Sequence, residues 1–176
     1  MQFKHAPAAV SAVFDDPNLV SAAGLVPMLR LAQAARLSEL AQARLSVPTD
    51  KGSNAGAKVS ALVAGMLAGA DSIDDMNLLR HGGMGRLFDR TYAPSTLGSF
   101  LREFRFGHVR QLDAVASRVL TSLTSQAALL QVRDGERVMV DLDDTIIEVH
   151  GYQKQGASFG YSGVRGLNAL LATAST

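Results

Sequence analysis

Apolar residues recur at intervals of three and four along the first three quarters of the sequence, which is the spacing of amphipathic helices. The longest run extends from Val109 to Leu130 and predicts one helix of about twenty residues. Shorter runs predict helices over residues 25–35, 38–45, 59–70, 72–80 and 95–104. The stretch 59–70 is nearly uncharged, so we expect its helix to be buried.

Polar and small residues mark where these helices begin and end. Residues 15–18, Asp-Asp-Pro-Asn, predict a helix start just before Leu19. Asp71 or Ser72 is the expected N-cap of one helix and Ser95 that of the next, because Asp and Ser side chains can accept a hydrogen bond from the first helical turn. Residues 47–57 are expected to form a loop, and Gly107 should interrupt the helical pattern.

The last quarter has the shorter apolar runs of β-strands. Residues 137–142 follow a turn signal and predict a strand, which residues 143–145, Asp-Asp-Thr, should end or bend. A second strand is expected over 146–150, with 157–161 pairing to it, and a further strand over 166–176. The pattern thus predicts a helical part followed by a sheet.

Composition narrows the class of protein. The chain has 176 residues, 47% of them hydrophobic and 19% charged, which is enough apolar material for a core. It has no Cys, which excludes disulfides and thiol catalysis and agrees with a cytoplasmic location. The longest apolar run, residues 61–70, is too short to cross a bilayer, and no secretory signal is apparent at the N-terminus.

Charge is distributed unevenly, although the formal net charge is only +1. Residues 80–118 contain seven Arg and no Lys, against three acidic residues. Residues 134–150 contain six acidic residues and one basic residue, Arg137. This basic middle followed by an acidic cluster is more informative about function than the net charge of the whole chain.

The acidic cluster is sharpest at Asp141, Asp143 and Asp144, directly after an apolar run. Like charges this close disfavour one another's ionisation, and a hard cation such as Mg²⁺ relieves that cost. Asp141 and Asp143 should point to one face of a strand and Asp144 to the other. The alternative is a solvated strand end whose Asp-Asp-Thr residues form a turn.

The basic middle contains a second set of candidate residues. Two short helices, 72–80 and 95–104, joined by a Gly-rich turn would resemble a helix-turn-helix. Arg102 and Arg105 are one helical turn apart and could both face DNA. Hydroxyl groups at the start of the same helix could contact phosphates, and these belong to Ser95, Thr96 and Ser99. The alternative is an ordinary solvated helix face above buried Phe side chains.

Two families carry a strand of this kind. The haloacid-dehalogenase-like phosphatases have an Asp-x-Asp-x-Thr motif, which Asp141, Asp143 and Thr145 match literally. That resemblance implies Asp141 as nucleophile and Asp143 as acid/base. Only 31 residues follow Thr145, however, and no later Lys and paired-acid motif can be placed, while the long helical region remains unexplained.

The second resemblance covers nearly the whole chain. Its ordered motifs are similar to those of bacterial insertion-sequence transposases with a ribonuclease-H-like DDE catalytic domain. They lie at residues 15–27, 69–76, 81–84, 93–104, 106–112, 141–145 and 152–161. Several motifs in one order are more specific than any one alone, so this resemblance is preferred over the phosphatase.

This resemblance implies a mainly α region over 1–133 that binds DNA, followed at 134–176 by the first strands of an incomplete ribonuclease-H-like α/β domain. It implies transposition of DNA with Mg²⁺ or Mn²⁺ in the full-length enzyme, acting on terminal inverted repeats as a homodimer. Asp143 best matches the first catalytic, metal-binding acid, with Asp141 the close alternative. Because the later Asp and Glu are missing, we expect a catalytically incomplete copy, or a non-catalytic DNA-binding remnant.

Overall fold

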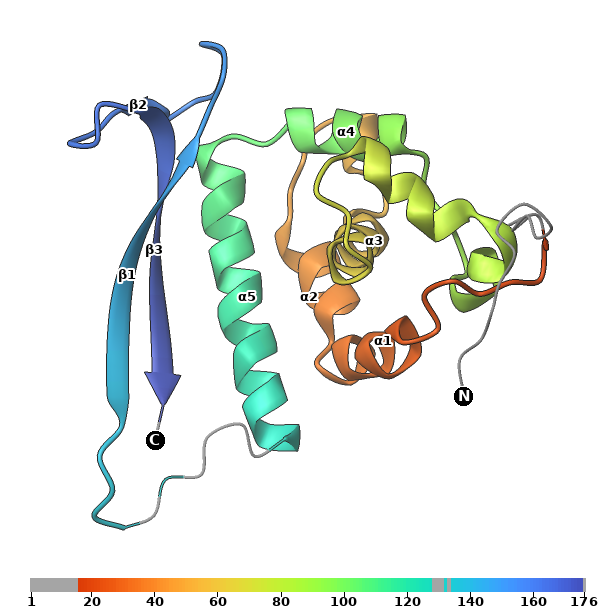
Figure 1. The fold of residues 1–176 in the computed structure, drawn as a ribbon, viewed down its shortest axis with the longest axis horizontal. Helices are drawn as coiled ribbons and strands as arrows, with labels where there is room; N and C mark the ends of the chain where they lie inside the picture. Colours follow the sequence, from red (N-terminus) through yellow and green to blue (C-terminus); the bar gives the residue numbers. More distant parts are fainter. Residues whose placement is uncertain (1–15, 128–131, 133, 176) are drawn as a thin grey trace, which may run out of the picture.

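The structure, a computed structural model, describes residues 16–127, 132 and 134–175, and it places a small sheet after a helical part (Figure 1). The prediction of a mainly helical region followed by strands is confirmed. The α-helices are α1 Leu25–Ala34, α2 Leu37–Arg44, α3 Ala55–Leu67, α4 Pro94–Arg102 and α5 Phe106–Gln126. The 3₁₀ segments are η2 Asp50–Gly52, η3 Asp74–Arg80 and η4 Gly82–Leu87. The strands are β1 Met139–Glu148, β2 Ser158–Phe159 and β3 Arg165–Ser175.

The helical part is organised around α3, which contributes to both hydrophobic clusters. One cluster joins α1, α3, η3, η4 and α4 through Leu25, Ala61, Ala64, Met76, Leu79, Met84 and Leu97. The other joins α2, α3, α4 and α5 through Ala41, Leu45, Ala55, Val59, Phe100 and Val115. Small residues on α3 allow its neighbours to approach from both sides. The burial expected for 59–70 holds only as far as Gly65, because Met66 and Leu67 are exposed.

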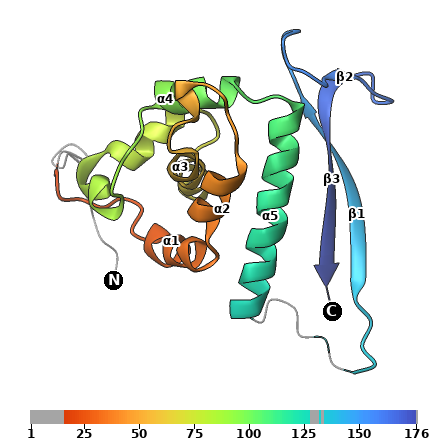
Figure 2. The ribbon, with the colours of Figure 1, turned by 180° about the vertical axis from the view of Figure 1, so that it is seen from behind.

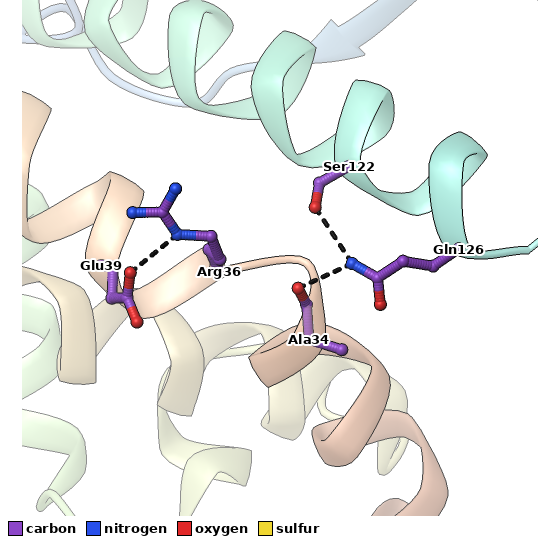
Figure 3. Close-up of polar contacts among 5 residues, drawn as sticks. All are labelled: Ala34, Arg36, Glu39, Ser122 and Gln126. Carbon is purple, nitrogen blue, oxygen red and sulfur yellow. Dashed lines mark hydrogen bonds and ion pairs between the residues drawn. The ribbon is translucent and has the colours of Figure 1, made fainter.

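The long helix α5 lies between the other helices and the strands, as both views of the ribbon show (Figures 1 and 2). Gln111 fixes its first half to the loop after α2, with hydrogen bonds of 3.0 and 2.8 Å to the backbone N–H and the hydroxyl of Ser46. At the other end, Gln126 Nε2 donates to the carbonyl of Ala34 at 2.8 Å and to Ser122 Oγ at 3.2 Å (Figure 3). The two ends of α5 are thus held by polar contacts, while Val115 packs between them.

The sheet is antiparallel, with strand order β1-β3-β2. Its main part is a long ribbon in which Asp143 pairs with Leu171 and Thr145 with Ala169. β2 adds only two residues, which pair with Arg165 and Gly166 of β3. The expectation that 157–161 pairs with 146–150 is therefore wrong, since β2 pairs with β3 instead.

Two further expectations about boundaries are wrong. Asp16 and Pro17 do not start a helix, because the Asp16 side chain accepts a hydrogen bond from the N–H of Asn18 at 2.8 Å and holds a turn there. The first helix starts only at Leu25. Likewise the Asp-Asp-Thr sequence at 143–145 does not break the strand, since β1 runs unbroken through it.

Several other boundaries differ by a few residues. α3 starts at Ala55, inside the expected loop, and Gly107 lies in the first turn of α5 rather than interrupting it. The N-cap expected at Asp71 or Ser72 is wrong, because the 3₁₀ segment η3 begins at Asp74 with Ile73 as its N-cap, and the Ser72 hydroxyl donates to Asp75 Oδ2 at 2.6 Å. Asp15, Leu130 and Thr176, at the ends of expected elements, lie outside the described residues.

Most of the β-ribbon is exposed on both faces. Leu142 on β1 and Leu170 on β3 are each 69% exposed. Burial is confined to the end near the β2 turn, where Val149 is 5% exposed. Asp141, Asp143 and Asp144 thus lie in the middle of an exposed strand, not at the end of a buried one as the apolar run suggested. No helix in the described part of the chain has the length and apolarity needed to cross a membrane.

Candidate nucleic-acid interface

The arginines of the basic middle share one property in the structure, which is that their side chains are exposed and lack an acidic partner. In the part of the chain described here, the ion pairs are Arg36 with Glu39 and Lys51 with Glu103. All seven arginines between 80 and 118 are exposed and take part in neither pair; they are Arg80, Arg86, Arg90, Arg102, Arg105, Arg110 and Arg118. Their positive charge is therefore available to an external anion.

Helix α4 presents a polar stripe on one side and a core face on the other. Ser95, Ser99 and Arg102 are spaced by four and three residues and thus lie on one face. Arg102 Nη2 donates to Ser99 Oγ at 3.3 Å. On the opposite face Leu97 and Phe100 are fully buried. The solvated helix face above a buried Phe, which the alternative interpretation expected, is therefore present, and DNA binding by this face stays a prediction.

Ser95 and Thr96 occupy the first turn of α4, where both are exposed. The expected N-cap at Ser95 is wrong, because the helix begins one residue earlier with Pro94, and Ala93 is its N-cap. Proline suits this first position, since it lacks an N–H that would need a partner. The serine and threonine hydroxyl groups are thus free of a capping role in the helix.

Arg105 does not continue the face of α4, which corrects the expectation that it lies one helical turn beyond Arg102. α4 ends at Arg102, and Arg105 has an extended backbone, with φ −126° and ψ 173°, as the N-cap of α5. Its backbone N–H donates to His108 Nδ1 at 3.0 Å, and its guanidinium group is on an exposed residue. The two arginines therefore flank the bend between the helices.

The expected helix-turn-helix is also altered. Residues 81–93 separate η3 from α4 and include η4, whereas a helix-turn-helix has a turn of three or four residues. η3 is itself a 3₁₀ segment. The two elements still pack together, since a Cβ placed on Gly98 of α4 would lie 3.3 Å from Cγ2 of Ile73. The pair is thus not a compact helix-turn-helix.

Lys51 of η2 joins this surface, and sequence reasoning missed it. Its Nζ lies 2.9 Å from Oε1 of Glu103, the C-cap residue of α4. Hydrogen bonding to Glu103, and then the charge of the same carboxylate, raise the pKa of Lys51. We refer to Lys51, Lys58, Arg102, Glu103 and Arg105 together as the α4–α5 corner. It holds four cations and one carboxylate, which pairs with Lys51, and the charge of Asp50 acts on both lysines.

Lys58 is the buried member of this corner and is only 5% exposed. Its ammonium group donates to the carbonyl of Lys51 at 2.6 Å and lies 5.3 Å from the centre of the Phe100 ring. Burial lowers the pKa of Lys58, and the charge of Asp50 opposes this only in part. The η2 backbone is thus fixed to α3 by a buried cation.

The acidic strand has simpler surroundings. Successive side chains of β1 point to opposite faces of the strand, so Asp141 and Asp143 share one face and Asp144 lies on the other, as predicted. Thr145 Oγ1 donates to Asp143 Oδ2 at 3.1 Å. Among the residues described, no three His, Cys, Asp or Glu side chains come together in a group that could hold a metal ion. Metal binding by Asp143 and Asp141 stays a prediction.

An apolar cavity of about 410 Å³ lies on the side of α3 that faces η3 and α4. Its lining includes Val63, Met66, Ile73 and Leu101, and Asp71 is the one charged residue among those that line it. Met66 is 62% exposed at this position. A cavity of this size and lining suits apolar groups rather than phosphates.

Comparison of the chain with protein-family models, with curated proteins and with solved structures gives no match.

Proposed function

We propose that the chain is the DNA-binding N-terminal region of an insertion-sequence transposase, joined to the first strands of its ribonuclease-H-like domain. The observation that carries the proposal is the set of seven exposed arginines between 80 and 118 with no carboxylate partner among the described residues. Arginine is one of the side chains that most often contact DNA phosphates, and an exposed arginine without a carboxylate partner keeps its charge for such a contact.

The separation of charge supports the same function. The seven arginines of residues 80–118 belong to the helical part. The acidic cluster of residues 134–150 belongs largely to the ribbon on the other side of α5 (Figures 1 and 2). A DNA backbone would be attracted to the first surface and repelled by the second. The ordered motifs that resemble the transposases span both parts of the chain.

The acidic strand would supply the start of a metal site in this proposal. Asp143 and Asp141 share one exposed face, and carboxylate oxygens are the ligands that Mg²⁺ and Mn²⁺ take. When bound, such ions activate water or a 3′-hydroxyl for attack on a phosphodiester. The hydrogen bond from Thr145 orients the Asp143 carboxylate. Two carboxylates alone do not complete a two-metal site, so further acidic ligands are needed.

The test is a titration of the full chain into DNA duplexes tiled across the sequence that flanks its gene, with a shuffled duplex of the same composition as control. We expect one flanking duplex to bind at least about tenfold more tightly than the shuffled one, because specific sites exceed random DNA by that margin or more. Equal, salt-independent binding to every duplex, or none at all, would contradict the proposed function.

A further inference from the structure

The α4–α5 corner contains an ion pair whose position matters more than its strength. Lys51 and Glu103 are 52 residues apart in sequence, and their side chains are 48% and 24% exposed. A solvent-accessible pair of this kind contributes little to stability. It does hold one positive and one negative group beside Arg102, whose charge opposes the rise that Glu103 causes in the pKa of Lys51.

The loop that carries Lys51 is fixed from below. Lys58 of α3 donates to the backbone carbonyl of Lys51, and this contact does not involve the Lys51 side chain. The η2 backbone is thus positioned while the Lys51 ammonium group stays at the surface and pairs with the Glu103 carboxylate. Arg102 and Arg105 follow on the same corner, at the end of α4 and the start of α5.

We propose that η2 is a second DNA-contacting element, in which Lys51 exchanges its ion pair with Glu103 for a phosphate of the duplex. Glu103 then acts as an internal competitor, because it occupies the Lys51 ammonium group and repels the DNA backbone. This inference rests on the proposed DNA binding and assigns to it a residue, Lys51, and an opposing charge that limits affinity.

The exchange is chemically matched. A phosphate oxygen and a carboxylate oxygen accept the same charge-assisted hydrogen bond from an ammonium group, so Lys51 keeps one such bond throughout. Arg102 and Arg105 would contact neighbouring phosphates in the same complex. Lys51 thus becomes a third cation in contact with phosphates, beside Arg102 and Arg105, and the Glu103 carboxylate is left to solvent.

The experiment compares Glu103→Gln with Glu39→Gln in salt titrations of the full chain on one duplex. Both variants break an exposed ion pair and add one unit of positive charge, but Glu39 pairs with Arg36 at the opposite end of the helical part, near the end of α5 (Figure 3). We expect Glu103→Gln to bind about two- to fivefold more tightly than Glu39→Gln, the range that a single exposed charge interaction produces.

Lys51→Ala provides the second arm, and it should reduce the slope of log affinity against log salt by about 0.9, the value for one lost phosphate contact. Equal affinities of the two Gln variants, or an unchanged slope in Lys51→Ala, would overturn this inference while DNA binding by the wild type stands. Absence of DNA binding by the wild type would instead overturn the proposed function. Circular dichroism of Lys51→Ala checks that the helices remain folded.

Discussion

At the scale of single residues, Lys58 is the unusual feature of the molecule. Among the described residues it is the one charged side chain that is buried, and no carboxylate pairs with it. Burying an ammonium group is costly unless other groups replace its water. The carbonyl of Lys51 and the face of Phe100 replace part of it. Lys58 therefore joins α3 to η2, but the desolvation of its ammonium group reduces the stability that this hydrogen bond contributes.

The free-energy penalty of burying the Lys58 ammonium group should depend on pH. Burial lowers the pKa of Lys58 from 10.5, so between the lowered value and 10.5 the unfolded chain binds more protons than the folded chain. In that window the free energy of unfolding should rise with pH, and below it the penalty is constant. We expect urea unfolding of wild type and Lys58→Met to show this gain in the wild type alone.

Lys51 does not obscure that test, because its pKa is raised and its contribution is lost only as pH rises above 10.5. Unfolding curves of the two proteins that stay parallel from neutral pH to 10.5 would show that Lys58 is well solvated in the folded state.

At the scale of elements, α3 depends on small residues where its neighbours approach. A Cβ added to Gly56 would lie 2.1 Å from the backbone carbonyl oxygen of Ser38 on α2, a contact that neither helix can accommodate without moving. At Gly65 the nearest atom would be Sδ of Met76, at 2.2 Å. The two glycines therefore set the distance from α3 to α2 and to η3.

Gly56→Ala should destabilise the protein by about 1–3 kcal/mol, the usual cost of overpacking. Gly107→Ala is the matched control, since Gly107 lies in the first turn of α5 and an added Cβ would meet nothing within 4 Å. Alanine is the better helix former there and should stabilise by about 0.5–1 kcal/mol. Chemical denaturation of both variants measures this, and a Gly56→Ala variant as stable as wild type would show that α2 and α3 are not packed as described.

Local patterns predicted the helices better than they predicted the strands. The spacing of Leu112, Val115 and Val119 was enough for α5, because its packed face repeats with the helical period. The Asp-Asp-Thr sequence misled because it favours turns, yet pairing with β3 carries β1 straight through it. Pairing partners are distant in sequence, and no local signal specifies them.

The same reason limited the prediction of the site. The exposure of Arg102 and of the Ser95 and Thr96 hydroxyls follows from the period of α4. The contribution of Lys51 does not, because its contact with Glu103 exists only once η2 packs against the end of α4. The course of the chain at Arg105 also depends on the bend between α4 and α5.

At the scale of the whole molecule, the two parts differ in how they are stabilised. The helical part has two hydrophobic clusters, whereas the ribbon exposes Val140, Leu142, Leu170 and Leu171. Contacts between the two are sparse, and one of them is the hydrogen bond of 3.1 Å from the Phe106 N–H to Gln155 Oε1. DNA binding by the helical part should therefore not depend on the ribbon.

The central claim is that the α4–α5 corner binds DNA, and a salt titration of Arg102→Ala/Arg105→Ala tests it most directly. The control is Arg30→Ala/Arg137→Ala, which also removes two exposed cations, one on α1 and one just before β1, both far from the corner (Figure 1). We predict that the corner variant loses affinity and that its slope of log affinity against log salt falls by about two contacts' worth, while the control keeps the wild-type slope. Equal slopes in the two variants would contradict the account and direct attention to Arg80, Arg86 and Arg90.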